Sequence, residues 1–207
     1  MRIVILGGTG PSAHIVIYAR NPQKLPAHLS SKNHPEISIV QGELQDLNAL
    51  STALTGAHAI LSALGPNFGN PSGTPLAHGY AVVLEAMRSA GVKRLIALGT
   101  PSIRDENDKF SIIYSAMITA FSLVASSAYK DIVAVGDVIR ASEDIDWTLV
   151  RVPTLKNEKN REVLVGYIGD GSAGGRYTLA RLGFATFVLK ELENAKWIRR
   201  APLITSA

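Results

Sequence analysis

Short apolar runs alternate with segments of helical periodicity along almost the whole chain, and this alternation constrains the fold more than any other feature. The apolar runs are continuous or nearly so, as expected of strands covered on both faces. They lie at residues 3–6, 15–18, 37–40, 59–64, 94–98 and 147–152. Helical patterns lie at residues 47–54, 76–90, 111–127, 131–142 and 179–193. The alternation predicts an α/β fold with a doubly wound parallel sheet.

The length and composition fit one globular unit. With 207 residues, 46% of them hydrophobic, the chain is expected to form a single domain over residues 1–207. It has no cysteine, which excludes a disulfide framework, a thiol nucleophile and cysteine-ligated metals. Its five histidines are scattered without a paired spacing. We therefore expect no metal site.

The charge pattern argues against large anionic partners. The net charge is +4, but the basic residues are dispersed and no nucleic-acid-binding motif accompanies them. We expect a small-molecule substrate and no nucleic acid. Residues 110–129 contain no charged residue. Their Ser and Thr content nevertheless favours a buried or amphipathic helix over a membrane span. We expect a cytoplasmic protein without a membrane partner, in which this helix could serve a homo-oligomer.

A glycine-rich segment directly follows the first apolar run. Residues 7–13 read GGTGPSA, a GxxGxxA pattern. In dinucleotide-binding folds such glycines allow a tight turn and a close approach of backbone N–H groups to the pyrophosphate. The alternative is a glycine-rich hairpin turn.

A basic residue ends the second apolar run. An acidic residue at this point would bind the ribose hydroxyls of NAD, whereas Arg20 would pair with the additional 2′-phosphate of NADP. The sequence therefore favours NADP as the cofactor. The alternative for Arg20 is a solvated surface charge.

Several longer segments together resemble a known family. They read GGTGPS, ARNPQKL, GELQD, LSALG, AMRSAGVKRLIALGTPS and DWTLVRVP, in register from Met1 to about Leu203. The chain resembles the atypical short-chain dehydrogenases of the NmrA-like, NAD(P)H-binding group, which includes flavin reductase/biliverdin-IX-beta reductase and fungal oxidoreductases of secondary metabolism. The resemblance implies a single Rossmann-like domain that binds NADP.

The resemblance also assigns roles to individual residues. On the cofactor's phosphate side, the loop positions and the 2′-phosphate position correspond to Gly7, Thr9, Gly10 and Arg20. Around the adenosine, the ribose and the nicotinamide, the corresponding positions are Leu64, Gly65, Thr100, Ser102 and Pro153. Thr100 and Ser102 are the candidate catalytic residues, as hydrogen-bond donors to a substrate carbonyl or to the nicotinamide amide. Alternatively, they only cap their loop.

The N-terminal unit departs from the family pattern. Only eight residues, 7–14, separate the first two apolar runs, whereas a parallel crossover needs roughly a dozen or more. We therefore expect either a shortened N-terminal βαβ unit that lacks its helix, or an antiparallel hairpin of the two runs that reverses one strand. We expect weaker cofactor binding and an uncovered sheet face. The candidates to lie on that face or its opposite are Ile3, Ile5, Val16 and Tyr18.

The sequence also lacks the Tyr-x-x-x-Lys pair of standard short-chain dehydrogenases. In the NmrA-like group this absence is usual. We expect an NADPH-dependent oxidoreductase that transfers hydride to a quinone-, flavin- or carbonyl-type acceptor. The alternatives are a non-catalytic NAD(P)-sensing regulator and a truncated paralogue with impaired cofactor binding. Residues 104–109 are expected to form a solvated loop, with substrate gating as the alternative. Residues 166–175 are expected to form a flexible loop that varies specificity.

Overall fold

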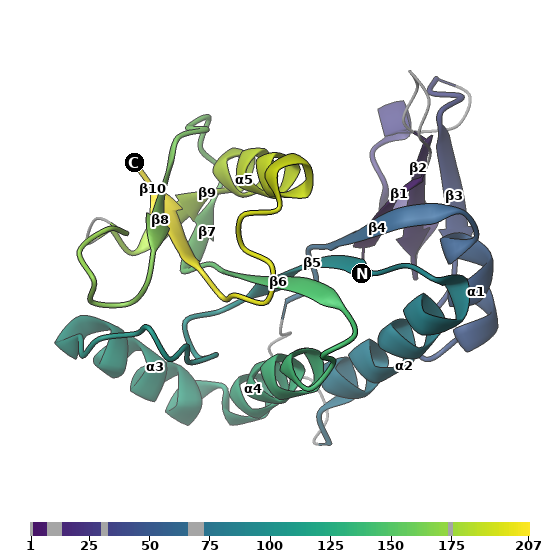
Figure 1. Ribbon diagram of the computed structural model, residues 1–207. Helices are drawn as coiled ribbons and strands as arrows, with labels where there is room; N and C mark the ends of the chain where they lie inside the picture. The colour runs from purple at the N-terminus through teal and green to yellow at the C-terminus, as the bar shows by residue number, and fades with distance from the viewer. Residues whose placement is uncertain (1, 8–13, 30–32, 66–72, 174–175) are drawn as a thin grey trace.

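The computed structural model describes residues 2–7, 14–29, 33–65, 73–173 and 176–207 (Figure 1). Eight strands form the main sheet in the order β3-β2-β1-β4-β5-β6-β10-β8. These strands are β1 (Arg2–Gly7), β2 (His14–Ala19), β3 (Ile37–Gln41), β4 (Ala57–Ser62), β5 (Arg94–Gly99), β6 (Asp146–Arg151), β8 (Val163–Gly166) and β10 (Leu203–Ser206). A separate parallel pair consists of β7 (Thr154–Lys156) and β9 (Thr178–Ala180).

Five helices accompany the sheet in the described part of the chain. They are α1 (Leu47–Leu54), α2 (Pro75–Ala90), α3 (Ile112–Val124), α4 (Ser126–Arg140) and α5 (Arg181–Asn194). Strands β4, β5, β6 and β10 run parallel to one another, and β2 is parallel to β3, whereas β8 pairs antiparallel with β10. The predicted α/β fold with a mainly parallel, Rossmann-like sheet is confirmed.

Strand β1 runs against both of its neighbours. It pairs antiparallel with β2, from Arg2 opposite Ala19 to Gly7 opposite His14, and antiparallel with β4 on its other side. Of the two sequence-based alternatives, the structure has the hairpin. The physical reason is chain length, because the short connection cannot carry a crossover helix but can return directly into an antiparallel strand.

Alternate residues of the central strands bury against helices on opposite faces. On one face, Ile60, Leu95 and Leu149 pack in a common core with residues of α1, α2 and α4. The next residues along, such as Leu61, Ile96 and Val150, pack with Phe187 and Val188 of α5. Figure 1 shows α2 and α4 below the sheet and α5 above it. This two-sided burial explains why these strands read as continuous apolar runs.

Strand β2 is covered despite the shortened N-terminal unit, so the expectation of an uncovered face is wrong for this strand. Tyr18 is 0% exposed and lies on the α1 side, where Val16 packs beside it. On the opposite face, Ile17 and Ala19 are buried, with Leu25 and Leu29 from two short 3-10 turns packed against them. These turns take over part of the covering role of a helix. The side chains of Ile3 and Ile5 lie outside the described residues.

The apolar segment from 111 to 142 divides into two helices with different bounds from those predicted. Helix α3 ends at Val124 and α4 begins at Ser126, because Ala125 leaves the helical conformation with φ −132° and ψ 52°. The chain bends by 118° between them. Among the described residues no single helix is long and apolar enough to cross a membrane, and α3 with α4 would qualify only as a bent pair, by length and composition.

The outer side of α3 remains apolar. Large hydrophobic side chains are exposed there and just before the helix, up to 84% at Val124 and 82% at Phe110. The other members of this group are Ile112, Ile113 and Leu123. Helix α3 thus packs one side against the molecule and presents a second apolar side to solvent.

Candidate active site

A cleft of about 530 Å³ opens at the carboxyl ends of β4, β5 and β6. Its floor comes from residues at or after these strand ends, and α3 forms a wall. The lining residues are Ala63, Gly65, Leu98, Thr100, Pro101, Ser102, Tyr114, Met117, Ile118, Phe121, Val152, Pro153, Thr154, Leu155 and Arg181. Ligands of open parallel α/β sheets bind outside the carboxyl ends of the strands. This cleft is therefore the candidate active site.

Four of the predicted site residues meet in this cleft. Gly65 follows β4, Thr100 and Ser102 follow β5, and Pro153 follows β6. They come together because neighbouring parallel strands end at the same edge of the sheet. Leu64 does not line the cleft, since its side chain is buried in the core beside it.

The phosphate-side residues are not brought to the same place. Gly7 pairs with His14 and Ala57, at the amino-terminal ends of β2 and β4, so the reversed β1 puts it at the sheet edge opposite the cleft. Thr9 and Gly10 lie outside the described residues. Arg20 follows the carboxyl end of β2 with an exposed side chain, for which the described part of the chain supplies no partner.

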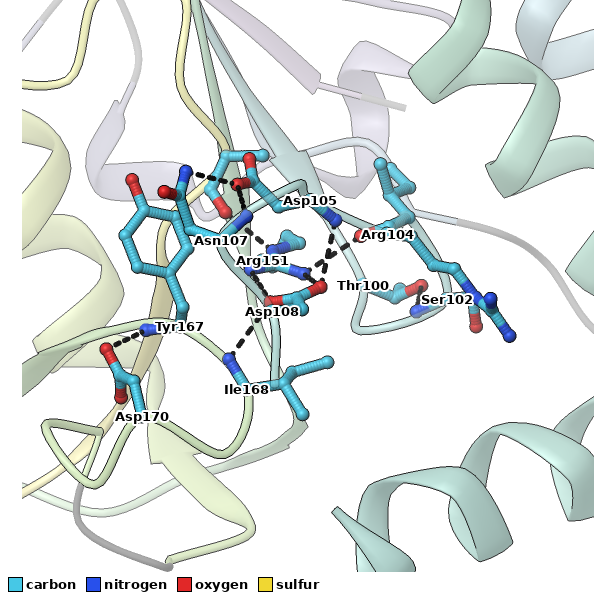
Figure 2. Close-up of polar contacts among 12 residues, drawn as sticks. Thr100, Ser102, Arg104, Asp105, Asn107, Asp108, Arg151, Tyr167, Ile168 and Asp170 are labelled. Carbon is cyan, nitrogen blue, oxygen red and sulfur yellow. Dashed lines mark hydrogen bonds and ion pairs between the residues drawn. The ribbon is translucent and has the colours of Figure 1, made fainter. Parts of the chain in front are cut away.

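Thr100 and Ser102 present hydroxyl groups at the cleft floor (Figure 2). The Ser102 backbone N–H donates to Thr100 Oγ1 at 3.3 Å, which orients the threonine side chain and leaves its hydroxyl hydrogen available. Ser102 is nearly buried, and its own hydroxyl has no partner among the described residues. Both groups can therefore donate a hydrogen bond to a bound molecule. This geometry is compatible with the predicted donor role and with a capping role.

A buried ion pair fixes the loop that carries these hydroxyls (Figure 2). Arg151, the last residue of β6, is 0% exposed and binds Asp108 through both terminal nitrogens, at 2.6 Å and 2.7 Å. Arg151 also donates from Nε to the backbone carbonyl of Ala201, at 2.6 Å, and from Nη1 to that of Ile103, at 3.0 Å. A fork-to-fork pair in which all three guanidinium nitrogens donate is an arrangement in which a buried charge is tolerated.

Asp108 also joins three segments of the chain. Its carboxylate accepts the backbone N–H groups of Asp105, at 2.8 Å, and of Ile168, at 3.0 Å. Desolvation raises the pKa of Asp108, but the hydrogen bonds and the charge of Arg151, with those N–H groups, outweigh it and hold the pKa below its usual value. The expectation that residues 104–109 form a solvated loop is wrong at Asp108, because this side chain turns inward to a buried cation.

The wall of the cleft is mainly apolar. Met117, Ile118 and Phe121 lie along α3 at helical spacing. Tyr114 is buried and donates its hydroxyl to the Arg176 carbonyl at 3.4 Å, and burial raises its pKa to about 12. Arg181, the first residue of α5, is the one charged residue among the lining residues described. No carboxylate, imidazole or lysine lines the cleft within the described part of the chain.

The described residues fit one half of a nicotinamide dinucleotide. The cleft has an apolar wall for a ring, hydroxyl donors on its floor and a glycine at its mouth, where an added Cβ would meet only Leu98 at 3.5 Å. For the pyrophosphate, by contrast, Gly7 lies at the wrong edge of the sheet. The cleft thus fits the nicotinamide half of such a cofactor, whereas Gly7, the described residue of the glycine segment, lies away from the cleft.

Reasoning from sequence missed three residues of the site. Asp108 stands in a charged stretch in which no local signal distinguishes it from its acidic neighbours. Arg151 belongs to an apolar strand, and a charge inside such a run is itself the signal, because a buried arginine requires a partner. Arg181 enters the cleft only because β9 carries the chain back to it.

Comparisons with known proteins agree with this geometry. The family model described as NAD(P)H-binding matches residues 9–195. The UPF0659 protein C216.03 of Schizosaccharomyces pombe is 28% identical over 174 residues, covering 79% of this chain and 69% of the relative. A short-chain dehydrogenase/reductase of Veillonella parvula in complex with NADP is 14% identical, with a TM-score of 0.72, covering 92% of this chain and 82% of that one. A Rossmann-fold NAD(P)-binding family protein of Shigella flexneri is 18% identical, with a TM-score of 0.60, over 92% and 79% of the two chains.

The two solved structures support the fold alone, because their sequence identities are low. The family model, however, extends over well more than half of the chain. It agrees with the resemblance to atypical short-chain dehydrogenases that the sequence motifs carry. The chain therefore belongs to the NAD(P)H-binding family.

Proposed function

We propose that this chain is an NADPH-dependent oxidoreductase whose acceptor is a planar, electron-poor molecule of the quinone or flavin type. The observation that carries the proposal is the cleft at the carboxyl ends of β4, β5 and β6, with its apolar wall and its two hydroxyl donors. When bound there, the cofactor supplies a hydride. Membership of the NAD(P)H-binding family supports the cofactor class, and Arg20 supports NADP over NAD.

The residues of the cleft favour such acceptors over simple carbonyl compounds. Reduction of a ketone or an aldehyde needs a proton donor with a suitable pKa at the new alkoxide. The lining residues described offer only hydroxyl groups and the Arg181 guanidinium. A quinone or a flavin accepts hydride into a delocalised ring and takes its proton from water. The chain then has only to stack the acceptor against Met117 and Phe121 and orient it with Thr100, so proximity supplies most of the rate.

A second candidate function is a regulator that binds NAD(P) without turnover. The reversed β1 favours it, because Gly7 is removed from the edge at which the cofactor's pyrophosphate would lie. Without the N–H donors and the partial positive charge of a glycine loop and its helix, binding should be weaker. A truncated paralogue that binds no cofactor is the limiting case.

A titration followed by a turnover assay separates these functions. The purified chain is titrated with NADPH and NADP⁺ while cofactor fluorescence is followed, and NADPH oxidation is then measured with a short-chain quinone, riboflavin and an aromatic aldehyde. The oxidoreductase binds in the micromolar range and turns over the quinone or riboflavin. Binding without turnover would identify the regulator, and absence of binding would refute both.

A matched pair of variants places the binding in the cleft. Gly65→Phe adds a ring at the cleft mouth, where the backbone tolerates a side chain, and should abolish NADPH binding. Ala116→Phe adds the same ring on the exposed side of α3 and should leave binding unchanged. Equal binding by both variants would place the cofactor elsewhere.

A further inference from the structure

We infer that the chain has a second ligand site, between α5 and β8, which accepts an aromatic molecule carrying an anionic group. A cavity of about 660 Å³ lies there, a volume in the usual range for small-molecule sites. It shares no lining residue with the cleft at the strand ends. The inference does not depend on the proposed oxidoreductase activity.

Two regular elements and one aromatic pair build the walls of this second site. Phe187, Lys190, Glu191 and Asn194 project from one face of α5 at spacings of three and four residues. Val163 and Val165 lie on one face of β8. Helix and strand approach closely at one point, since a Cβ added to Gly183 would lie 3.0 Å from Val163 Cγ1. The apolar walls are therefore held by secondary structure.

The aromatic pair gives the site a surface for stacking. The rings of Tyr167 and Trp197 lie edge to face, with centroids 6.0 Å apart and an interplanar angle of 67°. Trp197 is held in place by its backbone, whose N–H donates to Glu191 Oε1 at 2.9 Å and whose carbonyl accepts from Thr148 Oγ1 at 2.8 Å. Its indole N–H has no acceptor among the described residues. A bound aromatic ring gains stacking from this pair, and its anionic group gains a donor.

The charges around the cavity are unbalanced. Lys190, Lys196 and Arg200 line it with exposed side chains, and none of the three has an acidic partner among the described residues. Glu191 is the one acid of the described lining, and it is buried and already bonded to Arg94, at 2.6 Å, and to the Lys196 N–H, at 3.1 Å. It therefore cannot neutralise the rim. Three free cations above apolar and aromatic walls select a ring system that bears a carboxylate, sulfonate or phosphate.

The test uses two ligands that differ only in charge. Naphthalene-2-sulfonate and the neutral naphthalene-2-sulfonamide are titrated into the full chain by isothermal titration calorimetry, in low and in high salt. The sulfonate should bind about 10-fold or more tightly than the sulfonamide, the gain expected of a charge-assisted contact. High salt should weaken only the sulfonate, because only its binding depends on charge. Equal affinities, or no binding of either compound, would overturn the inference.

Variants then locate the binding. The double variant Lys190→Gln, Arg200→Gln removes two of the three rim cations and should remove most of the sulfonate's advantage over the sulfonamide. Lys130→Gln removes an exposed cation of α4 that does not line the cavity and should have no effect. An equal loss of sulfonate affinity in Lys130→Gln would place the probe elsewhere and contradict the second site.

Discussion

At the scale of single residues, the choice between NADP and NAD depends on Arg20. This residue follows the carboxyl end of β2, and its side chain is exposed and unpartnered in the described chain. A guanidinium in this place can form paired hydrogen bonds to a phosphate that NAD lacks. Replacing Arg20 with Ala should weaken NADPH binding about 10- to 100-fold and leave NADH binding almost unchanged. Fluorescence titration of both cofactors measures the two effects, and equal losses would mean that Arg20 acts structurally.

Asp108 is expected to be the most sensitive residue for stability near the cleft. Asp108→Asn leaves the fully buried Arg151 with an uncompensated charge, and breaking a buried pair in this way costs about 3–5 kcal/mol. Replacing both partners, as in Asp108→Leu with Arg151→Met, should recover a large part of this loss. Urea denaturation of the three chains measures the free energies of unfolding. A double variant no more stable than Asp108→Asn would contradict this account.

The same ion pair predicts how stability depends on pH. Because the native pKa of Asp108 lies below its usual value, its ionisation stabilises the fold above the unfolded pKa of about 3.9. This contribution is lost as the pH falls from about 4 through the native pKa. The difference in unfolding free energy between the natural chain and Asp108→Asn should thus be constant from about pH 5 to 8 and narrow below about pH 4. If this difference in unfolding free energy instead widened below about pH 4, the native pKa of Asp108 would have to lie above its usual value, which would contradict this account.

At the scale of secondary-structure elements, α2 receives its N-terminal cap from another helix. Thr74, the residue before it, makes no capping bond, and Asp131 of α4 accepts the Leu76 and Ala77 N–H groups instead, at 3.1 Å and 3.0 Å. The carboxylate is buried and lies at the positive end of the α2 dipole. One side chain therefore links two of the helices that cover the same face of the sheet.

Removing this cap should destabilise the whole fold. Asp131→Ala leaves two backbone N–H groups without acceptors, at a cost of about 1–3 kcal/mol in the free energy of unfolding. Asp137→Ala, an exposed position on the same helix, should change it by less than about 0.5 kcal/mol. Chemical denaturation of the two variants provides the comparison. Similar losses in both would show that the cap contributes no more than helix propensity.

Helices and strands could be predicted from the sequence where burial alone determines the pattern of apolar residues. The strands that become β4, β5 and β6 are apolar on both faces, so burial alone identifies them. The sequence pattern predicts a break between two helices at residues 128–130, but its position at Ala125 could not be foreseen, because no Pro or Gly marks it and the apolar pattern continues across it. Strands β7 to β10 are too short to carry a period of their own. Strand β10 forms beside β6 and in turn pairs with β8, whereas β7 and β9 pair with each other.

In the candidate site too, some residues follow from local sequence pattern, whereas others depend on distant parts of the chain. The family resemblance placed Gly65, Thr100 and Pro153 at one site, and the structure brings them together because each lies just beyond the end of one of three parallel strands. Gly7 has the same local pattern but lies at the other edge, since the direction of β1 depends on the length of the connection rather than on the glycines. The inward turn of Asp108 depends on Arg151, which is 43 residues away, and no local pattern reports such a contact.

At the scale of the whole molecule, the length of one connection sets both the direction of β1 and the state of the cofactor site. Inserting about sixteen residues of amphipathic helical sequence after Ser12 would allow a parallel crossover. The glycine segment would then follow a strand that ends at the cleft edge. We expect NADPH affinity and thermal stability to rise together. Calorimetric melting and cofactor titration test this, with an insertion of sixteen Gly and Ser residues as the control. A rise in neither property, or an equal rise with the control, would refute the link between connection length and site.

The reversed strand also sets an order of events for a chain leaving the ribosome. The β1–β2 hairpin joins residues at most 17 positions apart, from Arg2 and Ala19 inward, and such hairpins form in microseconds. The other edge of β1 pairs with β4, which is synthesised some forty residues later, whereas translation adds only about 5–20 residues per second. For seconds, therefore, the nascent chain carries a formed hairpin whose β1 edge is open. During that interval β4 from a neighbouring nascent chain can compete for the edge, which makes exchange of strands between copies the characteristic error of this fold.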